Sequence, residues 1–239
     1  MKIGPEFYYK WNHRRHLIGG LILLSLLFFG NYLPVNVTLS LMMLVAWMAL
    51  ISFVGFKRTF VATVISFFIP LIVHLVRVFY GKAVEGWAVE VELSLEMAVI
   101  STMVYGAIVW VLKLLKAKRA GFDQVIGACN LYVWIATIYA CFYTLISKIH
   151  PDAFHLQARL TTGLNDADMR QNFNELFYFS FVTQTTLGYG DIVPVMHSAR
   201  ALAISQAIIG QFYVAVVLTY ILNLWIQDIG KQVNKSNDA

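Results

Sequence analysis

The chain has 239 residues, of which 59% are hydrophobic, 15% aromatic and only 13% charged. Average proteins are about 45–50% apolar and about 25% charged, so these few charges cannot cover the surface of a soluble domain, and the hydrophobicity excludes a disordered chain. Two cysteines exclude a disulfide scaffold. The composition therefore predicts an integral membrane protein that lies mostly within the lipid bilayer.

Six stretches are long and apolar enough to cross a bilayer, which takes roughly 20 residues. In chain order they are 17–33, 37–56, 59–80, 93–115, 125–147 and 198–226. Between the last two lie a polar segment, 148–172, and an aromatic segment, 173–182, that is too short to span. The sequence predicts an all-α membrane protein with six transmembrane helices, divided into a four-helix domain, 1–120, and a second domain, 121–239.

Basic residues indicate the orientation of these spans. With the N-terminus inside and six crossings, twelve Lys and Arg residues fall inside and six outside, as the positive-inside rule expects. Both termini are therefore predicted to be cytoplasmic, in the plasma membrane or the inner membrane of a cell. The net charge of +5 follows from this topology and does not indicate nucleic-acid binding. No convergent nucleophile or acid–base pair is visible, so no enzyme is expected.

One loop carries the functional signal. The run Thr-Gln-Thr-Thr-Leu-Gly-Tyr-Gly-Asp, at 183–191, lies between the short aromatic segment and the last span. This run, in the order span, short helix, loop, span, resembles the selectivity filter and pore domain of the tetrameric potassium channels over roughly 125–227. The resemblance implies a re-entrant pore helix and filter loop, and a homotetramer around a closed axis. The alternative is a tight Gly-rich turn between two helices.

The residue types in this loop suit the chemistry of a filter. A potassium ion must lose its water there, so backbone carbonyl oxygens have to replace that water. Successive carbonyls reach one axis if the backbone alternates between left-handed and right-handed, and glycine adopts φ > 0 without steric cost. The resemblance assigns K⁺ binding to Thr186, whose hydroxyl also contributes, Leu187, Gly188, Tyr189 and Gly190. K⁺ in the filter is the expected ligand, with no organic cofactor.

Residues around the loop are expected to support it: Thr185, Tyr178 and Asp191. The family often has a Trp pair where this chain has Tyr178 and Phe179, and Tyr178 keeps a hydroxyl that could reach Asp191. Plain membrane packing is the alternative for the aromatic segment. Leu187 stands where the family usually has Val, and this leaves open a channel that passes Na⁺ as well as K⁺.

The last span resembles the inner helix of the family. Gly210 lies 19 residues after Asp191, which matches the glycine hinge of many such channels; close helix packing through a small residue is the alternative. Beyond it, Val214, Leu218 and Leu222 recur at every fourth position. Four copies could form a hydrophobic gate that closes by dewetting, or the stripe could face lipid.

The first domain departs from voltage-gated relatives with the same layout, whose fourth span carries a basic residue at every third position. Here that span has no Lys or Arg before Lys113 and only Glu96 as an acid, so steep voltage gating is not expected. Arg77 is predicted to pair with Glu96 inside the membrane, with Glu92 or His74 nearby, as a static pair or as a switch. A K⁺ transporter-like pore subunit and a non-conducting subunit remain alternatives.

Overall fold

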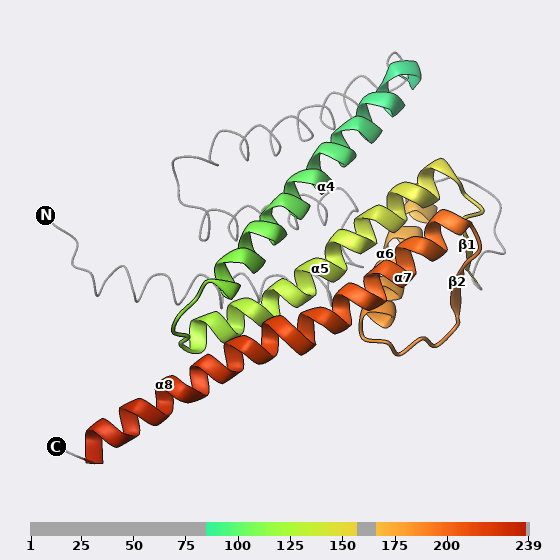
Figure 1. Cartoon of the computed structure of the whole chain (residues 1–239). Helices are drawn as coiled ribbons and strands as arrows, with labels where there is room; N and C mark the ends of the chain where they lie inside the picture. The colour runs from blue at the N-terminus through green and yellow to red at the C-terminus, as the bar shows by residue number, and fades with distance from the viewer. Residues whose placement is uncertain (1–84, 157–165, 238–239) are drawn as a thin grey trace, which may run out of the picture.

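The computed structural model describes residues 85–156 and 166–237 (Figure 1). In chain order the elements are α4 (Glu85–Leu115), α5 (Phe122–Ile149), β1 (Phe154–Leu156), α6 (Asp166–Gln184), β2 (Ile192–Pro194), α7 (His197–Phe212), the π-helix η3 (Tyr213–Leu218) and α8 (Thr219–Asn237). α7, η3 and α8 follow one another without a break and form one long helix beside α5. α4 packs on another side of α5 (Figure 1).

Three helical segments in the described residues can cross a membrane by length and composition: Glu96–Leu115, Gln124–Ile149 and His197–Lys231. They correspond to the last three predicted spans. The first three predicted spans lie outside the described residues, and the count of six stays a prediction. The last segment has 35 residues and is about 52 Å long, so it tilts in the roughly 30 Å hydrocarbon layer or extends beyond it.

A short turn joins α4 to α5, and it contains the predicted domain boundary at 120. Lys116 N–H and Ala117 N–H donate to the carbonyls of Leu112 and Leu114 at 3.2 and 3.1 Å, which closes the end of α4. The Gly121 N–H then donates to Oε1 of Gln124 at 2.8 Å and satisfies an amide at the start of α5. The division into two domains itself remains a prediction.

An aromatic cluster joins α5, β1 and α6. The rings of Tyr143, Phe154 and Phe179 lie with their centroids 5.1–5.7 Å apart in edge-on geometry, the arrangement that aromatic rings prefer. All three residues are buried, as is Phe177. The aromatic segment therefore packs mainly against its own chain, which differs from the lipid-packing alternative.

Two short strands correct the expectation of a purely helical chain. β1 and β2 pair antiparallel, with Leu156 opposite Ile192 and Phe154 opposite Pro194. Sequence reasoning placed both in loops, because three residues carry no readable periodicity. The pair brings residue 156, soon after α5, beside residue 192, shortly before the start of α7 (Figure 1).

Candidate functional site

The loop after α6 has an alternating backbone. Thr186, Gly188 and Gly190 have φ angles of 60°, 58° and 81°, and they are the only described residues with positive φ. The prediction for the two glycines is confirmed. Thr186 was not foreseen, because a β-branched residue seldom adopts a left-handed backbone. Every second residue is therefore left-handed, which is the pattern that a line of carbonyls along one axis requires.

The carbonyl groups of this loop are open to a ligand. The amides at its start close the end of α6 instead: Thr185 N–H donates to Phe181 O at 2.9 Å and Leu187 N–H to Val182 O at 3.0 Å. The Thr185 hydroxyl also donates to Phe181 O at 2.6 Å, as a supporting residue would. Among the described residues none donates to a carbonyl of 186–190, and all five of these residues are exposed.

Tyr178 and Asp191 join the two ends of the loop. The Tyr178 hydroxyl donates to Oδ2 of Asp191 at 2.8 Å, and Oδ1 accepts the Ile192 N–H at 3.0 Å. The predicted Tyr178–Asp191 contact is thus confirmed. This hydrogen bond is the main cause that raises the pKa of Tyr178, so the hydroxyl keeps the proton that it donates.

Gly210 packs against the end of α6. A Cβ added to Gly210 would lie 2.9 Å from Cγ of Gln184 and 3.0 Å from its carbonyl oxygen. Both distances are shorter than ordinary van der Waals contact. In this conformation the position is a close helix contact, as the packing alternative supposed. The helix departs from α geometry three residues later, at η3 (Tyr213–Leu218), and π-turns of this kind often mark functional sites in helices.

The predicted gate residues do not share one environment. Val214 is 39% exposed, whereas Leu218 and Leu222 are partly buried and pack against the hydrophobic core of their own chain. The reason is the π-helix, which adds a residue to a turn and so rotates everything after it. A period of four read from the sequence assumes unbroken α geometry, and it does not hold across η3.

Sequence reasoning missed a polar stripe on the same helix. Its members are exposed and recur at every fourth position of α8, after η3: Thr219, Asn223 and Gln227. Polar residues inside a membrane usually face a water-filled cavity or another protein surface. Their regular spacing in the last span is the sequence signal that predicts them.

Buried polar side chains behind the loop were missed as well. Ser180, Gln184 and Gln206 are fully buried, with relative exposures of 0%. A glutamine in the middle of an apolar span was the available signal, because polar groups in such places are costly unless they are hydrogen-bonded.

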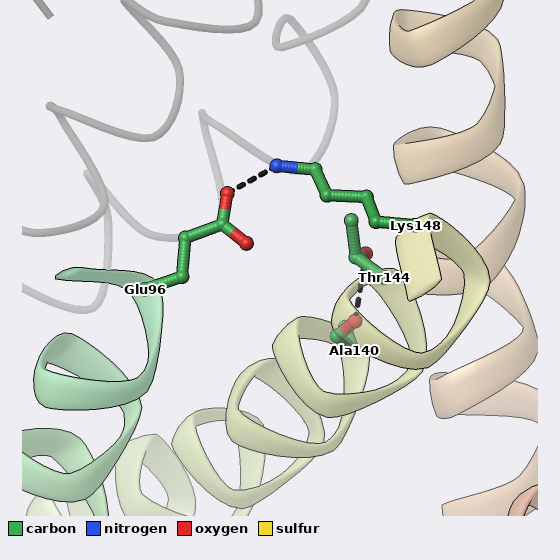
Figure 2. A network of polar contacts seen from close by, with 4 residues as sticks. All are labelled: Glu96, Ala140, Thr144 and Lys148. Carbon is green, nitrogen blue, oxygen red and sulfur yellow. Dashed lines mark hydrogen bonds and ion pairs between the residues drawn. The ribbon is translucent and has the colours of Figure 1, made fainter. Parts of the chain in front are cut away.

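Glu96 forms an ion pair that was not predicted. Its carboxylate accepts from Nζ of Lys148, at the far end of α5, and both side chains are 26% exposed (Figure 2). Figure 2 shows the lysine extended from the last turn of α5 toward α4. The predicted partner, Arg77, lies outside the described residues, as does His74. Sequence reasoning missed Lys148 because it was counted only as a loop residue beyond the fifth span.

Comparisons with known proteins agree with this geometry. Residues 128–227 match the family model described as "Ion channel"; these residues run from α5 through the loop and into α8. The chain is also similar to the voltage-gated potassium channel Kch of Escherichia coli (strain K12), with 28% identity over 166 residues. The alignment covers 66% of this chain and 37% of that protein, so this chain spans little more than a third of its relative's length. These similarities, together with the three long apolar helices, support an ion channel that is integral to a membrane.

Proposed function

We propose that four copies of this chain form a channel that conducts K⁺ selectively and passively across the plasma or inner membrane, with both termini cytoplasmic. The observation that carries the proposal is the alternation of positive φ at Thr186, Gly188 and Gly190. Together with the unpaired carbonyls in this loop, it supports a line of oxygens that replaces the hydration shell of the ion. The ion-binding groups are the carbonyls of Thr186, Leu187, Gly188, Tyr189 and Gly190, with the Thr186 hydroxyl at the inner end.

The exposure of the loop in the single chain supports the tetramer. In the single chain Leu187 is 58% and Tyr189 66% exposed, and Ile204, Ile208 and Phe212 on α7 are also exposed. One loop supplies one wall of a filter, and a ring with a rotation axis supplies the other three while covering the exposed side chains.

The gating proposal follows from the charges of α4. Its only basic residue is Lys113, in the last turn. One elementary charge that crosses the field contributes about 2.3 kcal/mol per 100 mV, and steep voltage gating takes 3–4 charges in each subunit. α4 cannot supply them, so open probability depends weakly on voltage. The proposed gate lies on the inner helix after Gly210, at the levels of Val214, Leu218 and Leu222, with η3 deciding which residues reach the axis.

Reversal potentials test the proposal. The purified protein is placed in planar bilayers under opposed K⁺ and Na⁺ gradients, and the reversal potential is expected to follow K⁺. Ba²⁺, which is similar to K⁺ in size, is expected to block from within the filter. A reversal potential that follows both ions equally would favour a non-selective cation channel, and no current from protein that forms tetramers would favour a non-conducting subunit.

Gly188→Ala sharpens this test. A Cβ at Gly188 meets no atom within 4 Å, but φ there is +58°, which disfavours any residue with a Cβ. We expect loss of K⁺-selective current while the tetramer still assembles. Gly230→Ala is the control, since that site has open space and lacks a positive φ. Wild-type selectivity in Gly188→Ala would contradict the assigned filter backbone.

A further inference from the structure

A buried side-chain amide on α7, the inner helix, connects it to α6, the proposed pore helix, and to α5. Nε2 of Gln206 on α7 donates to the carbonyl and hydroxyl oxygens of Ser180 at 3.0 and 2.7 Å, and to Oε1 of Gln184 at 3.2 Å. Its Oε1 accepts the hydroxyl of Tyr143, on α5, at 2.6 Å. One side chain therefore contacts three separate residues on two other helices.

Gln184 makes the second half of this network. Its Nε2 donates to the carbonyl of Tyr132 at 2.6 Å, and its own carbonyl accepts the Tyr132 hydroxyl at 3.1 Å. These two bonds run in opposite directions between the same two residues. The Ser180 hydroxyl completes the set with a bond to Ala136 O at 2.6 Å. The pore helix is thus tied to α5 at two successive turns.

The position of Gln184 gives the network its consequence. Gln184 is the last residue of α6, and Thr185 and Thr186 follow it directly. Gly210 of the inner helix lies against its Cγ and its carbonyl oxygen. The backbone that starts the filter is therefore held from one side by α5 and from the other by α7. A shift of either helix would move the first carbonyls of the loop.

Because the network is buried, its hydrogen bonds fix one arrangement of the three helices. Tyr143, Ser180, Gln184 and Gln206 all have relative exposures of 0%, so water cannot replace a lost partner. Apolar side chains of the same size could fill this space with little loss of stability, since a buried hydrogen bond adds little over good packing. Apolar packing would not select one orientation, whereas fully satisfied polar networks specify a unique arrangement.

We propose that Gln184 and Gln206 are positioning residues for the ion filter. They hold the end of α6 at a fixed distance from the inner helix, so that the ring of Thr186 oxygens keeps the width that suits K⁺. This inference rests on the proposed function. It differs from a purely structural role because it assigns ion discrimination, and not only stability, to two side chains that never touch the ion.

The test compares Gln206→Leu, Gln184→Leu and the double variant with the wild type. The control is Gln227→Leu, which removes an exposed amide from the same long helix. Reversal potentials give the Na⁺/K⁺ permeability ratio, and thermal unfolding of the tetramer gives stability. We expect each single variant to raise the ratio at least about fivefold, the lower end of coupling between packed elements. The double variant is expected to have a Na⁺/K⁺ permeability ratio no higher than that of either single variant, because the two amides act as a unit.

Tyr143→Phe keeps the proposal testable if the leucine variants do not assemble. It removes only the hydroxyl that binds Gln206 Oε1, and it should raise the Na⁺/K⁺ ratio in the same direction by a smaller factor. Lower thermal stability with unchanged selectivity in the variants that assemble would overturn the inference. A non-selective wild type would overturn the proposed function first, and the inference with it; a selective wild type with equally selective variants would overturn the inference alone.

Discussion

The two halves of the long helix α7–η3–α8 are held by different means. The half before η3, α7, has buried contacts at Ala199, Gln206 and Gly210, and its Ser205 hydroxyl bonds Tyr139 at 3.1 Å. The half after η3, α8, has the buried residue Ile221; its polar contact to the rest of the chain is an exposed bond from Tyr220 to Ala117 O at 2.8 Å, and the Trp225 ring contacts Phe122 at the start of α5. η3 separates the halves. Because buried polar contacts hold only the half before η3, we expect α8 to move more readily than α7.

Gly210→Ala, on α7, is expected to have the largest effect on stability and selectivity. The new methyl group meets Gln184 at 2.9 and 3.0 Å, where one of the two atoms is backbone. Overpacking of this kind costs about 1–3 kcal/mol, so the tetramer should unfold at a lower temperature and lose K⁺ selectivity. Gly230→Ala on α8 meets nothing within 4 Å and should be neutral or stabilising by about 1 kcal/mol.

The hinge interpretation makes a different forecast for Gly210→Ala. A hinge residue replaced by alanine would stiffen the helix, leave thermal stability intact and change open probability alone. Unchanged thermal stability together with a changed open probability would show that the helix bends at Gly210 and that Gln184 can shift to accommodate the methyl group.

Tyr213→Phe is expected to loosen the boundary between the halves. The Tyr213 hydroxyl donates to Ala128 O at 2.7 Å in a buried site, and its loss should cost about 1 kcal/mol. Because Tyr213 is the first residue of η3, we also expect the π-turn to relax and the residues after it to rotate. Tyr220→Phe, which removes an exposed bond, is the matched control and should change stability by less.

Thiol labelling measures that rotation. In a background without Cys129 and Cys141, water-soluble reagents should modify Thr219→Cys rapidly and Leu218→Cys slowly, because the first position is exposed and the second partly buried. Adding Tyr213→Phe should raise the rate at Leu218→Cys. Equal rates at both positions before and after that change would argue against a register set by η3.

The ion pair between Glu96 and Lys148 should have the smallest effect. Each side chain is 26% exposed, and pairs this open to solvent contribute at most about 1 kcal/mol. It also lies at the C-terminal end of α5, a helix that already has many buried residues. Glu96→Gln, Lys148→Gln and their combination should shift thermal unfolding slightly and leave gating unchanged, with Lys116→Gln as the exposed control. If the single variants differ strongly from the wild type in how open probability depends on pH, the pair acts as a switch and not as a static contact.

Sequence alone was sufficient for the features that depend on local chemistry. Apolar length predicted the last three spans because a membrane sets the length of a helix. Gly188 and Gly190 predicted their left-handed backbone, since this depends on the absence of a Cβ. The contact between Tyr178 and Asp191 was expected from the resemblance to the potassium channel filter, in which an aromatic residue of the short helix supports the loop, and the structure contains it.

Tertiary structure decided which side of each helix is covered, and the sequence does not contain that information. Leu218 and Leu222 pack against their own chain after η3, and no residue type in Tyr213–Leu218 predicts a π-turn. The strand pair of β1 and β2 joins segments too short to have a period. The partners of Gln206 and Glu96 lie at least 22 residues away along the chain. A polar residue in an apolar span shows that some partner is needed, but only the packing of the helices decides which partner it meets.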